Sequence, residues 1–170
     1  LLWQYLKDYQ KERVFTFFNP ERDPLGNGYH IMQSKIALGS GAVLGKGYLD
    51  GTQSHLNFLP EMHTDFVFSI FSEEFGFLGS IILILIYLYV LCYGVLSSYK
   101  AKNTFSKLII AGLTVNTFLY FIVNISMVIG LIPVVGVPLP LVSYGGSAML
   151  VTMISFGLIM NLNNFKETLN

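Results

Sequence analysis

The stretch LPEMHTDFVFSIFSEEFGFLG, residues 59–79, divides the sequence into two parts of different chemistry. It begins with a proline and several polar residues, and it ends in a run of apolar side chains. Residues 1–65 are of mixed polarity, whereas residues 66–163 are mostly apolar. An acidic side chain at such a junction is costly unless it has a partner or a function. Asp65 is therefore the first candidate functional residue, and we expect it at a membrane surface.

The composition indicates a membrane protein. Of the 170 residues, 53% are hydrophobic and only 12% are charged, which is well below the charged share of a soluble domain. The net charge is zero, so no basic surface argues for binding to nucleic acid. Cys92 is the only cysteine and lies in an apolar run, where inert packing is expected. The sequence starts at Leu1 without the features of a signal peptide, and we expect that an N-terminal part precedes it.

The first 65 residues predict a large loop outside the membrane that contains short helices. Residues 1–6 resemble the end of a preceding span, and the charged residues after them predict a surface helix, for which a soluble amphipathic helix is the alternative. Prolines and glycines in residues 19–28 indicate turns. The pattern of residues 29–38 is typical of a short helix at the membrane interface.

Residues 39–51, which we call the glycine segment, contain five glycines. Such a run lets backbone N–H groups approach an anion closely, so a phosphate-binding loop is one interpretation. The spacing of known phosphate-binding motifs is not present in it. A flexible re-entrant loop is the other interpretation, and the local sequence leaves both open.

The second part of the sequence predicts three transmembrane helices, at about residues 75–96, 108–132 and 141–162. The fold class is therefore an all-α polytopic membrane protein. Asn116 and Asn124 lie in the second span, where amides usually bind a neighbouring helix. The proline-rich hinge, residues 133–146, separates the second and third spans. Residues 97–107 carry three lysines and no acid, so this loop and the tail, residues 164–170, should be cytoplasmic.

This topology places residues 19–65 and the hinge together on the outer side of the membrane. Because irregular backbone at membrane depth must be buried or line a cavity, we expect a cavity that opens outward. Steps of 100° put Asp65, Ser69, Ser72 and Gly76 on one face of the helix that follows. Loss of hydration at the membrane edge would raise the pKa of the Asp65 carboxyl towards that of a general base. The alternative is that Thr64 or Asp65 caps the helix.

Three separate motifs give the sequence a family resemblance. They are FLPEMHTDFVFSIFSEEFGFLG, the loop sequences YHIMQSKIALGSG and GTQSHLNFLPE, and LIPVVGVPLPLVSYGGSA in the hinge. Together they resemble the SEDS membrane proteins, the RodA/FtsW group, and within it the elongation branch rather than the division branch. The resemblance covers about residues 19–162 and implies the last three transmembrane helices of such a protein.

The resemblance implies a peptidoglycan glycosyltransferase that polymerises lipid II during cell elongation, in the bacterial cytoplasmic membrane with its active site on the extracytoplasmic face. It implies Asp65 as the general base. The partners would be the growing glycan strand, a class B penicillin-binding protein and other membrane proteins of the elongation complex. A divalent cation, Mg²⁺ or Mn²⁺, could neutralise the departing diphosphate, although no metal ligands are assigned.

Other residues have the chemistry to bind such a substrate. Lys35, Lys46 and the glycine segment could hold the diphosphate. Gln53, Ser54, Glu61 and His63 could hold sugar hydroxyls or orient Asp65. The third span would begin at the sequence Ser143, Tyr144, Gly145 and Gly146, where a helix N-terminus favours anions and capping or close packing is the alternative.

Two other functions are compatible with the same pattern. A lipid II flippase would need charged groups along the depth of the spans, but the three predicted spans contain no charged residue and their polar groups are neutral. A non-catalytic membrane scaffold of the cell-wall synthesis complex would not require Asp65. The sequence favours chemistry at the surface over a flippase and leaves the scaffold open.

Overall fold

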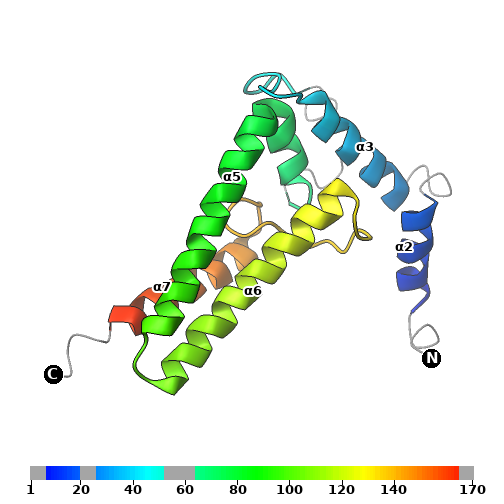
Figure 1. Ribbon diagram of the computed structural model, residues 1–170. Helices are drawn as coiled ribbons and strands as arrows, with labels where there is room; N and C mark the ends of the chain where they lie inside the picture. The colour runs from blue at the N-terminus through cyan, green and yellow to red at the C-terminus, as the bar shows by residue number, and fades with distance from the viewer. Residues whose placement is uncertain (1–6, 20–25, 52–63, 165–170) are drawn as a thin grey trace.

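The described residues form five α-helices and no β-strand. The computed structural model describes residues 7–19, 26–51 and 64–164. The helices are α2 (Asp8–Phe18), α3 (Asn27–Ser40), α5 (Val67–Lys100), α6 (Thr104–Ile129) and α7 (Gly146–Asn164) (Figure 1). The predicted all-α class is thus confirmed, and helices α2 and α3 occur where the sequence predicted short helices in the loop.

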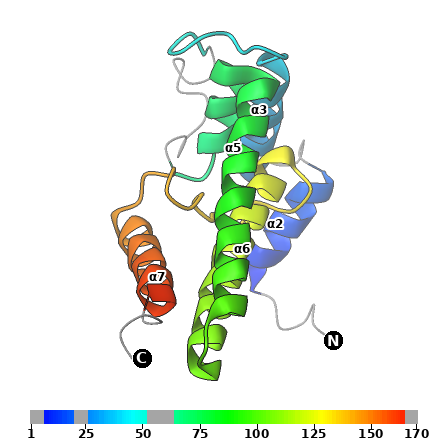
Figure 2. The ribbon, with the colours of Figure 1, turned by 60° about the vertical axis from the view of Figure 1, so that its left-hand side comes forward.

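Helices α5 and α6 form the main pair, joined at one end by residues 101–103 (Figures 1 and 2). Both are long and apolar enough to cross a membrane, whereas the apolar part of α7, Gly146–Leu162, is shorter. Tyr87 and Phe121 stack in the core between α5 and α6 with ring centroids 4.5 Å apart. Because helical runs of 20 or so apolar residues can span the hydrocarbon, this pair supports the expected membrane location.

Helix α5 bends back on itself at Gly76, which has φ 67° and ψ −164°. The hydroxyls of Ser72 and Ser80 are 2.8 Å apart, although eight residues of straight helix would separate them by about 12 Å. The chain therefore forms a short arm, residues 67–75, and a long arm, residues 77–100 (Figure 1). The sequence predicted one helix from Asp65 into the first span, and this was wrong because Gly76 breaks it.

The helix bounds differ from the predicted spans by several residues. Helix α5 is longer at both ends than 75–96, and α6 runs from 104 to 129 instead of 108 to 132. Gly130 ends α6 in the left-handed conformation, with φ 78°, which is a common helix stop. Helix α7 begins at residue 146 and not at 141, because the hinge holds Pro138 and Pro140 and residue Leu141 has φ 67°.

The hinge reaches the depth of the long arm of α5. The hydroxyl of Tyr87 donates a hydrogen bond to the carbonyl of Pro140. Tyr87 is eleven residues beyond Gly76, which corresponds to about 16 Å of helix. Figure 1 shows the hinge crossing beside the middle of α5. Irregular backbone thus enters the layer of apolar helices, as expected for a segment that is buried by protein or lines a cavity.

Candidate active site

The glycine segment closes the break in α5. Its backbone and that of α5 form four hydrogen bonds, from Lys46 N to Glu73 O (3.0 Å), Gly47 N to Glu74 O (3.1 Å), Phe77 N to Ala42 O (3.0 Å) and Leu78 N to Val43 O (3.1 Å). The break leaves carbonyl and N–H groups of the helix without helical partners, and the glycine segment supplies hydrogen-bond partners for four of them. The N–H groups of residues 46 and 47 therefore bind helix carbonyls, which leaves them unavailable to a phosphate.

The glycines allow this close approach. A Cβ atom on Gly45 would lie 2.0 Å from the carbonyl oxygen of Glu74, and one on Gly76 would lie 2.2 Å from the nitrogen of Gly45. Both residues also have positive φ, which disfavours larger side chains. The contacts show that the segment caps a broken helix. Neither of the two interpretations from the sequence, a phosphate-binding loop or a flexible re-entrant loop, included this role.

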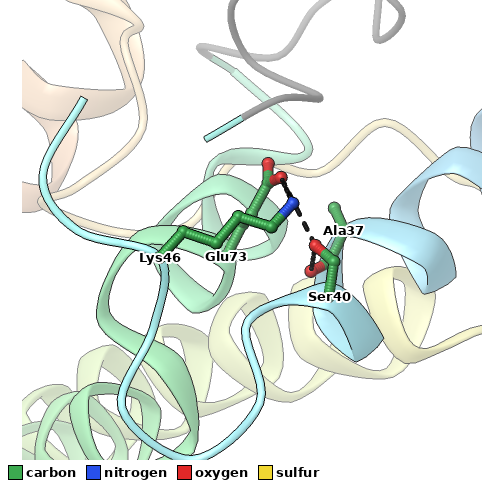
Figure 3. Close-up of polar contacts among 4 residues, drawn as sticks. All are labelled: Ala37, Ser40, Lys46 and Glu73. Carbon is green, nitrogen blue, oxygen red and sulfur yellow. Dashed lines mark hydrogen bonds and ion pairs between the residues drawn. The ribbon is translucent and has the colours of Figure 1, made fainter. Parts of the chain in front are cut away.

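Lys46 and Glu73 form an ion pair beside this cap (Figure 3). The Lys46 Nζ atom is 2.6 Å from Glu73 Oε1, and the Glu73 side chain is fully buried. The hydroxyl of Ser40 also donates to Glu73 Oε1, at 3.3 Å. Glu73 thus compensates the charge of the Lys46 ammonium beside the break in α5. Glu73 is therefore a structural residue. A role of Lys46 in binding a diphosphate stays a prediction.

Lys35 lies at the end of α6. A Cβ atom on Gly130 would be 2.7 Å from Lys35 Nζ, so the ammonium sits over the C-terminal turn of that helix, where the helix dipole favours a cation. The residue is exposed. A role of Lys35 in binding a diphosphate stays a prediction.

Two side chains hold the backbone at Asp65. The hydroxyl of Ser143 donates to the carbonyl of Thr64 at 2.5 Å. The amide of Asn124 donates to the carbonyl of Asp65 at 2.9 Å and to that of Val137 at 2.6 Å. Two consecutive carbonyls are thereby fixed against the hinge and α6, which sets the position of the Asp65 backbone.

The Asp65 carboxylate lies against the hinge. A Cβ atom on Gly136 would be 3.3 Å from Asp65 Oδ2, and Gly136 has φ 80°. Thr64 and Asp65 thus meet the hinge, as the predicted topology required of this end of the loop. Asp65 is not the helix cap, because α5 begins at Val67 and its N-cap is Phe66, without a side-chain hydrogen bond.

An open groove of about 600 Å³ lies next to this segment, and Val67, two residues after Asp65, is part of its lining. Its lining comprises Val67, Met149 and residues 141–146. All four of the predicted hinge residues are in this lining: Ser143, Tyr144, Gly145 and Gly146. The first turn of α7 opens at the same place. The lining of the groove thus includes a helix N-terminus, which favours anions, and Ser143, which is bonded to the carbonyl of Thr64 next to Asp65.

A second cavity of about 290 Å³ lies between α6, the hinge and α7. Ser143 lines both spaces. The lining of this second cavity also includes the polar side chains of Asn116, Thr152 and Ser155. Asn116, predicted to bind a neighbouring helix, therefore faces this cavity.

Four predicted site residues lie outside the described residues: Gln53, Ser54, Glu61 and His63. Within residues 7–19, 26–51 and 64–164, no three His, Cys, Asp or Glu side chains come together as metal ligands.

Comparison with known proteins identifies the family. Residues 1–168 match the family of FtsW, RodA and SpoVE cell cycle proteins. The chain belongs to this FtsW/RodA/SpoVE family. Its predicted resemblance is thus confirmed, and with it the all-α polytopic membrane fold.

Individual relatives agree with the family assignment. The chain is 51% identical to the peptidoglycan glycosyltransferase MrdB of Escherichia coli K12 over 100% of its own length and 46% of that protein's. It is 46% identical to the peptidoglycan glycosyltransferase RodA of Treponema pallidum over 93% of its length and 36% of that protein's. The chain thus spans less than half the length of these curated relatives.

Solved structures show the same fold. A structure described as the structural coordination of polymerization and crosslinking by a peptidoglycan synthase complex matches with a TM-score of 0.75 and 30% identity, over 98% of this chain and 45% of the other. An aspartate-to-alanine mutant of the rod shape determining protein RodA of Thermus thermophilus matches with a TM-score of 0.62 and 30% identity, over 74% of this chain and 39% of the other.

Sequence reasoning missed three contacts of this FtsW/RodA-type site. It assigned Asn124 to a neighbouring helix, but the amide binds carbonyls of two non-helical segments. It did not predict that Gly136 lies against the Asp65 carboxylate. Arg13 of α2 also donates to the carbonyl of Val135 in the hinge, at 3.2 Å. An asparagine in an apolar span was the available signal, but its partners depend on how the hinge folds.

Proposed function

We propose that the protein is a peptidoglycan glycosyltransferase that polymerises lipid II during cell elongation, with Asp65 as the general base. One observation carries this proposal. The Asp65 backbone is fixed by hydrogen bonds at its own carbonyl and that of Thr64, beside a groove lined by residues 141–146. The names of the relatives, peptidoglycan glycosyltransferase MrdB and RodA, support the reaction class.

The chemistry follows from these groups. The Asp65 carboxylate accepts the proton of the acceptor sugar hydroxyl as that oxygen attacks the anomeric carbon of the donor. A new C–O bond forms, the bond from the anomeric carbon to the diphosphate oxygen breaks, and the lipid diphosphate leaves with the electron pair. A positioned base contributes about 10²–10⁴-fold to such a rate. Stabilisation of the leaving diphosphate must supply much of the remainder.

The diphosphate would lie at the N-terminal turn of α7. This end of the groove is formed by Tyr144, Gly145 and Gly146, where helix N–H groups and the dipole favour negative charge. Lys35, Gln53, Ser54, Glu61 and His63 are further proposed contacts of the diphosphate, the sugars or Asp65. A bound Mg²⁺ or Mn²⁺ would add charge neutralisation at the diphosphate.

We place the active site on the extracytoplasmic face of the bacterial cytoplasmic membrane. Lys100, Lys102 and Lys107 lie in or beside the turn between α5 and α6, and such a cluster of lysines favours the cytoplasm. The hinge leaves α6 at the opposite end from this turn (Figure 1). A class B penicillin-binding protein is the proposed partner, supported by the solved complex that combines polymerization and crosslinking.

The experiment reconstitutes the full-length protein with its transpeptidase partner in liposomes that contain lipid II. We expect glycan strands from the complex and none from the partner alone. Transfer of lipid II across the bilayer without any polymer would contradict the proposal in favour of a flippase. Polymer formed equally well by the partner alone would contradict it in favour of a scaffold. Repeating the assay with EDTA and then with added Mg²⁺ or Mn²⁺ tests the cation.

A further inference from the structure

The side chain of Asn124 connects the catalytic segment with the hinge. It is fully buried on α6, and its Nδ2 atom donates to Asp65 O and Val137 O. Because both partners are carbonyl oxygens, only the amide nitrogen can face them, which settles the orientation of the side chain. The Oδ1 atom is buried, and no hydrogen-bond partner for it occurs in the described part of the chain.

The two hydrogen bonds of Asn124 satisfy carbonyl groups of irregular backbone, which would be unfavourable if they were buried without a donor. Asn124 therefore stabilises one particular path of the chain at Asp65. Both donors go to backbone groups beside the proposed base and beside Gly136, the residue against its carboxylate. The amide thus fixes the distance between Asp65 and the hinge.

Ser143 provides a second, independent connection. Its hydroxyl donates to Thr64 O and accepts a hydrogen bond from Leu139 N at 2.7 Å. Phe66, on the other side of Asp65, is 2% exposed and belongs to the core. The peptide groups on both sides of Asp65 are therefore held, and its carboxylate can move mainly by rotation about its own side-chain bonds.

We propose that Asn124 is a positioning residue for the Asp65 carboxylate. The inference rests on the proposed function, since it needs Asp65 to act as the base. Asn124 is not among the residues that line the groove or the second cavity, so it acts through the Asp65 backbone rather than through the substrate. A base displaced by about 1 Å can lose about 10²-fold in rate.

The test uses a graded series in the full-length protein with its partner, assayed for polymerisation of lipid II. Asn124→Leu keeps the approximate shape and removes both donors. Asn124→Ser keeps one donor and disturbs the fold less. We expect kcat to fall by about 10²-fold for Asn124→Leu and by an intermediate factor for Asn124→Ser. The KM for lipid II should be unchanged in both, because the groove itself is intact.

Thr114→Val is the matched control. Thr114 is also buried on α6, but its hydroxyl donates to the carbonyl of Ile110 in the same helix, at 2.7 Å. Its kcat should equal that of the parent. All variants are first compared by thermal unfolding and by co-purification with the partner.

Several results would overturn the inference. The first is a parental kcat in Asn124→Leu, or in Asn124→Ser if only that variant folds. The second is a variant of Asn124 in which KM rises while kcat is unchanged. The third is a loss of kcat in Thr114→Val as large as that in Asn124→Leu. The Asp65→Asn variant separates this inference from the proposed function. If Asp65→Asn is inactive while Asn124→Leu keeps the parental kcat, only the positioning role fails. If Asp65→Asn keeps its activity, the assignment of the base fails.

Discussion

At the scale of single residues, the pair of Lys46 and Glu73 shows how the fold compensates a buried charge with an opposite one. The Glu73 side chain is 0% exposed, and that of Lys46 is 28% exposed. Removing one partner of a buried pair leaves an uncompensated charge, which is far more costly than removing both. The pair stabilises the contact of the glycine segment with α5, since Lys46 is in the first and Glu73 in the second.

We therefore predict that Lys46→Met lowers the free energy of unfolding by up to about 3 kcal/mol. The double variant Lys46→Met with Glu73→Gln should regain most of this loss, because no buried charge remains. Unfolding in mixed micelles with increasing SDS measures both values. A double variant that is less stable than Lys46→Met alone would contradict this explanation.

Asp65 could be singled out from the sequence, but its surroundings could not. The acid stands where polar residues give way to apolar ones, and this signal is local. Asp65 contacts Asn124 and Gly136, which lie 59 and 71 residues away along the chain. Its neighbour Thr64 is bonded to Ser143, 79 residues away. No periodicity in the sequence encodes such contacts, because they depend on the path of the hinge.

At the scale of elements, the break in α5 is the feature that hydropathy did not predict. Hydropathy correctly indicated the helices themselves, since long apolar runs identify them. The polar face of Ser69, Ser72 and Gly76 was recognised, and all three residues are indeed buried. Whether a glycine breaks a helix depends on what packs against it, here Gly45 and its neighbours.

This explanation predicts opposite effects for two glycines in predicted spans. Gly76→Ala should lower the free energy of unfolding by more than about 2 kcal/mol, because its backbone conformation is almost exclusive to glycine and the new Cβ would meet Gly45 N at 2.2 Å. Gly112→Ala is the control, since no atom lies within 4 Å of a Cβ there. It should be neutral or stabilise the helix by up to about 1 kcal/mol.

The same SDS titration compares the two glycine variants. A Gly76→Ala protein as stable as Gly112→Ala would show that α5 can continue as an unbroken helix. In that case the capping role of the glycine segment would not be required.

At the scale of the whole molecule, the charge pattern predicts which end faces the cytoplasm. Lys100, Lys102 and Lys107 flank the turn between α5 and α6, whereas the hinge and the glycine segment are far from that turn (Figure 1). We expect a single cysteine at Asn103, in a Cys92→Ala background, to react with an impermeant maleimide only in inside-out vesicles. A single cysteine at Tyr48, which is 72% exposed, should react only in right-side-out cells.

Labelling of both positions from the same side would contradict this topology.

The sequence predicted from charge alone which end of the helices faces the cytoplasm, whereas the depth of the hinge in the membrane could be seen only in the structure. The hydrogen bond from the Tyr87 hydroxyl to the Pro140 carbonyl places irregular backbone beside the middle of α5. Nothing in the local sequence of the hinge specifies that depth.

The most direct test of the account is the polymerisation rate of Asp65→Asn in the full-length protein with its partner. This change removes the base but keeps the size of the side chain, and the backbone bonds at Thr64 and Asp65 should remain. Asp50→Asn is the matched control, because Asp50 is exposed in the glycine segment. We predict a loss of at least about 10²-fold in kcat for Asp65→Asn and the parental rate for Asp50→Asn. Parental polymerisation by a folded Asp65→Asn protein would contradict the central claim.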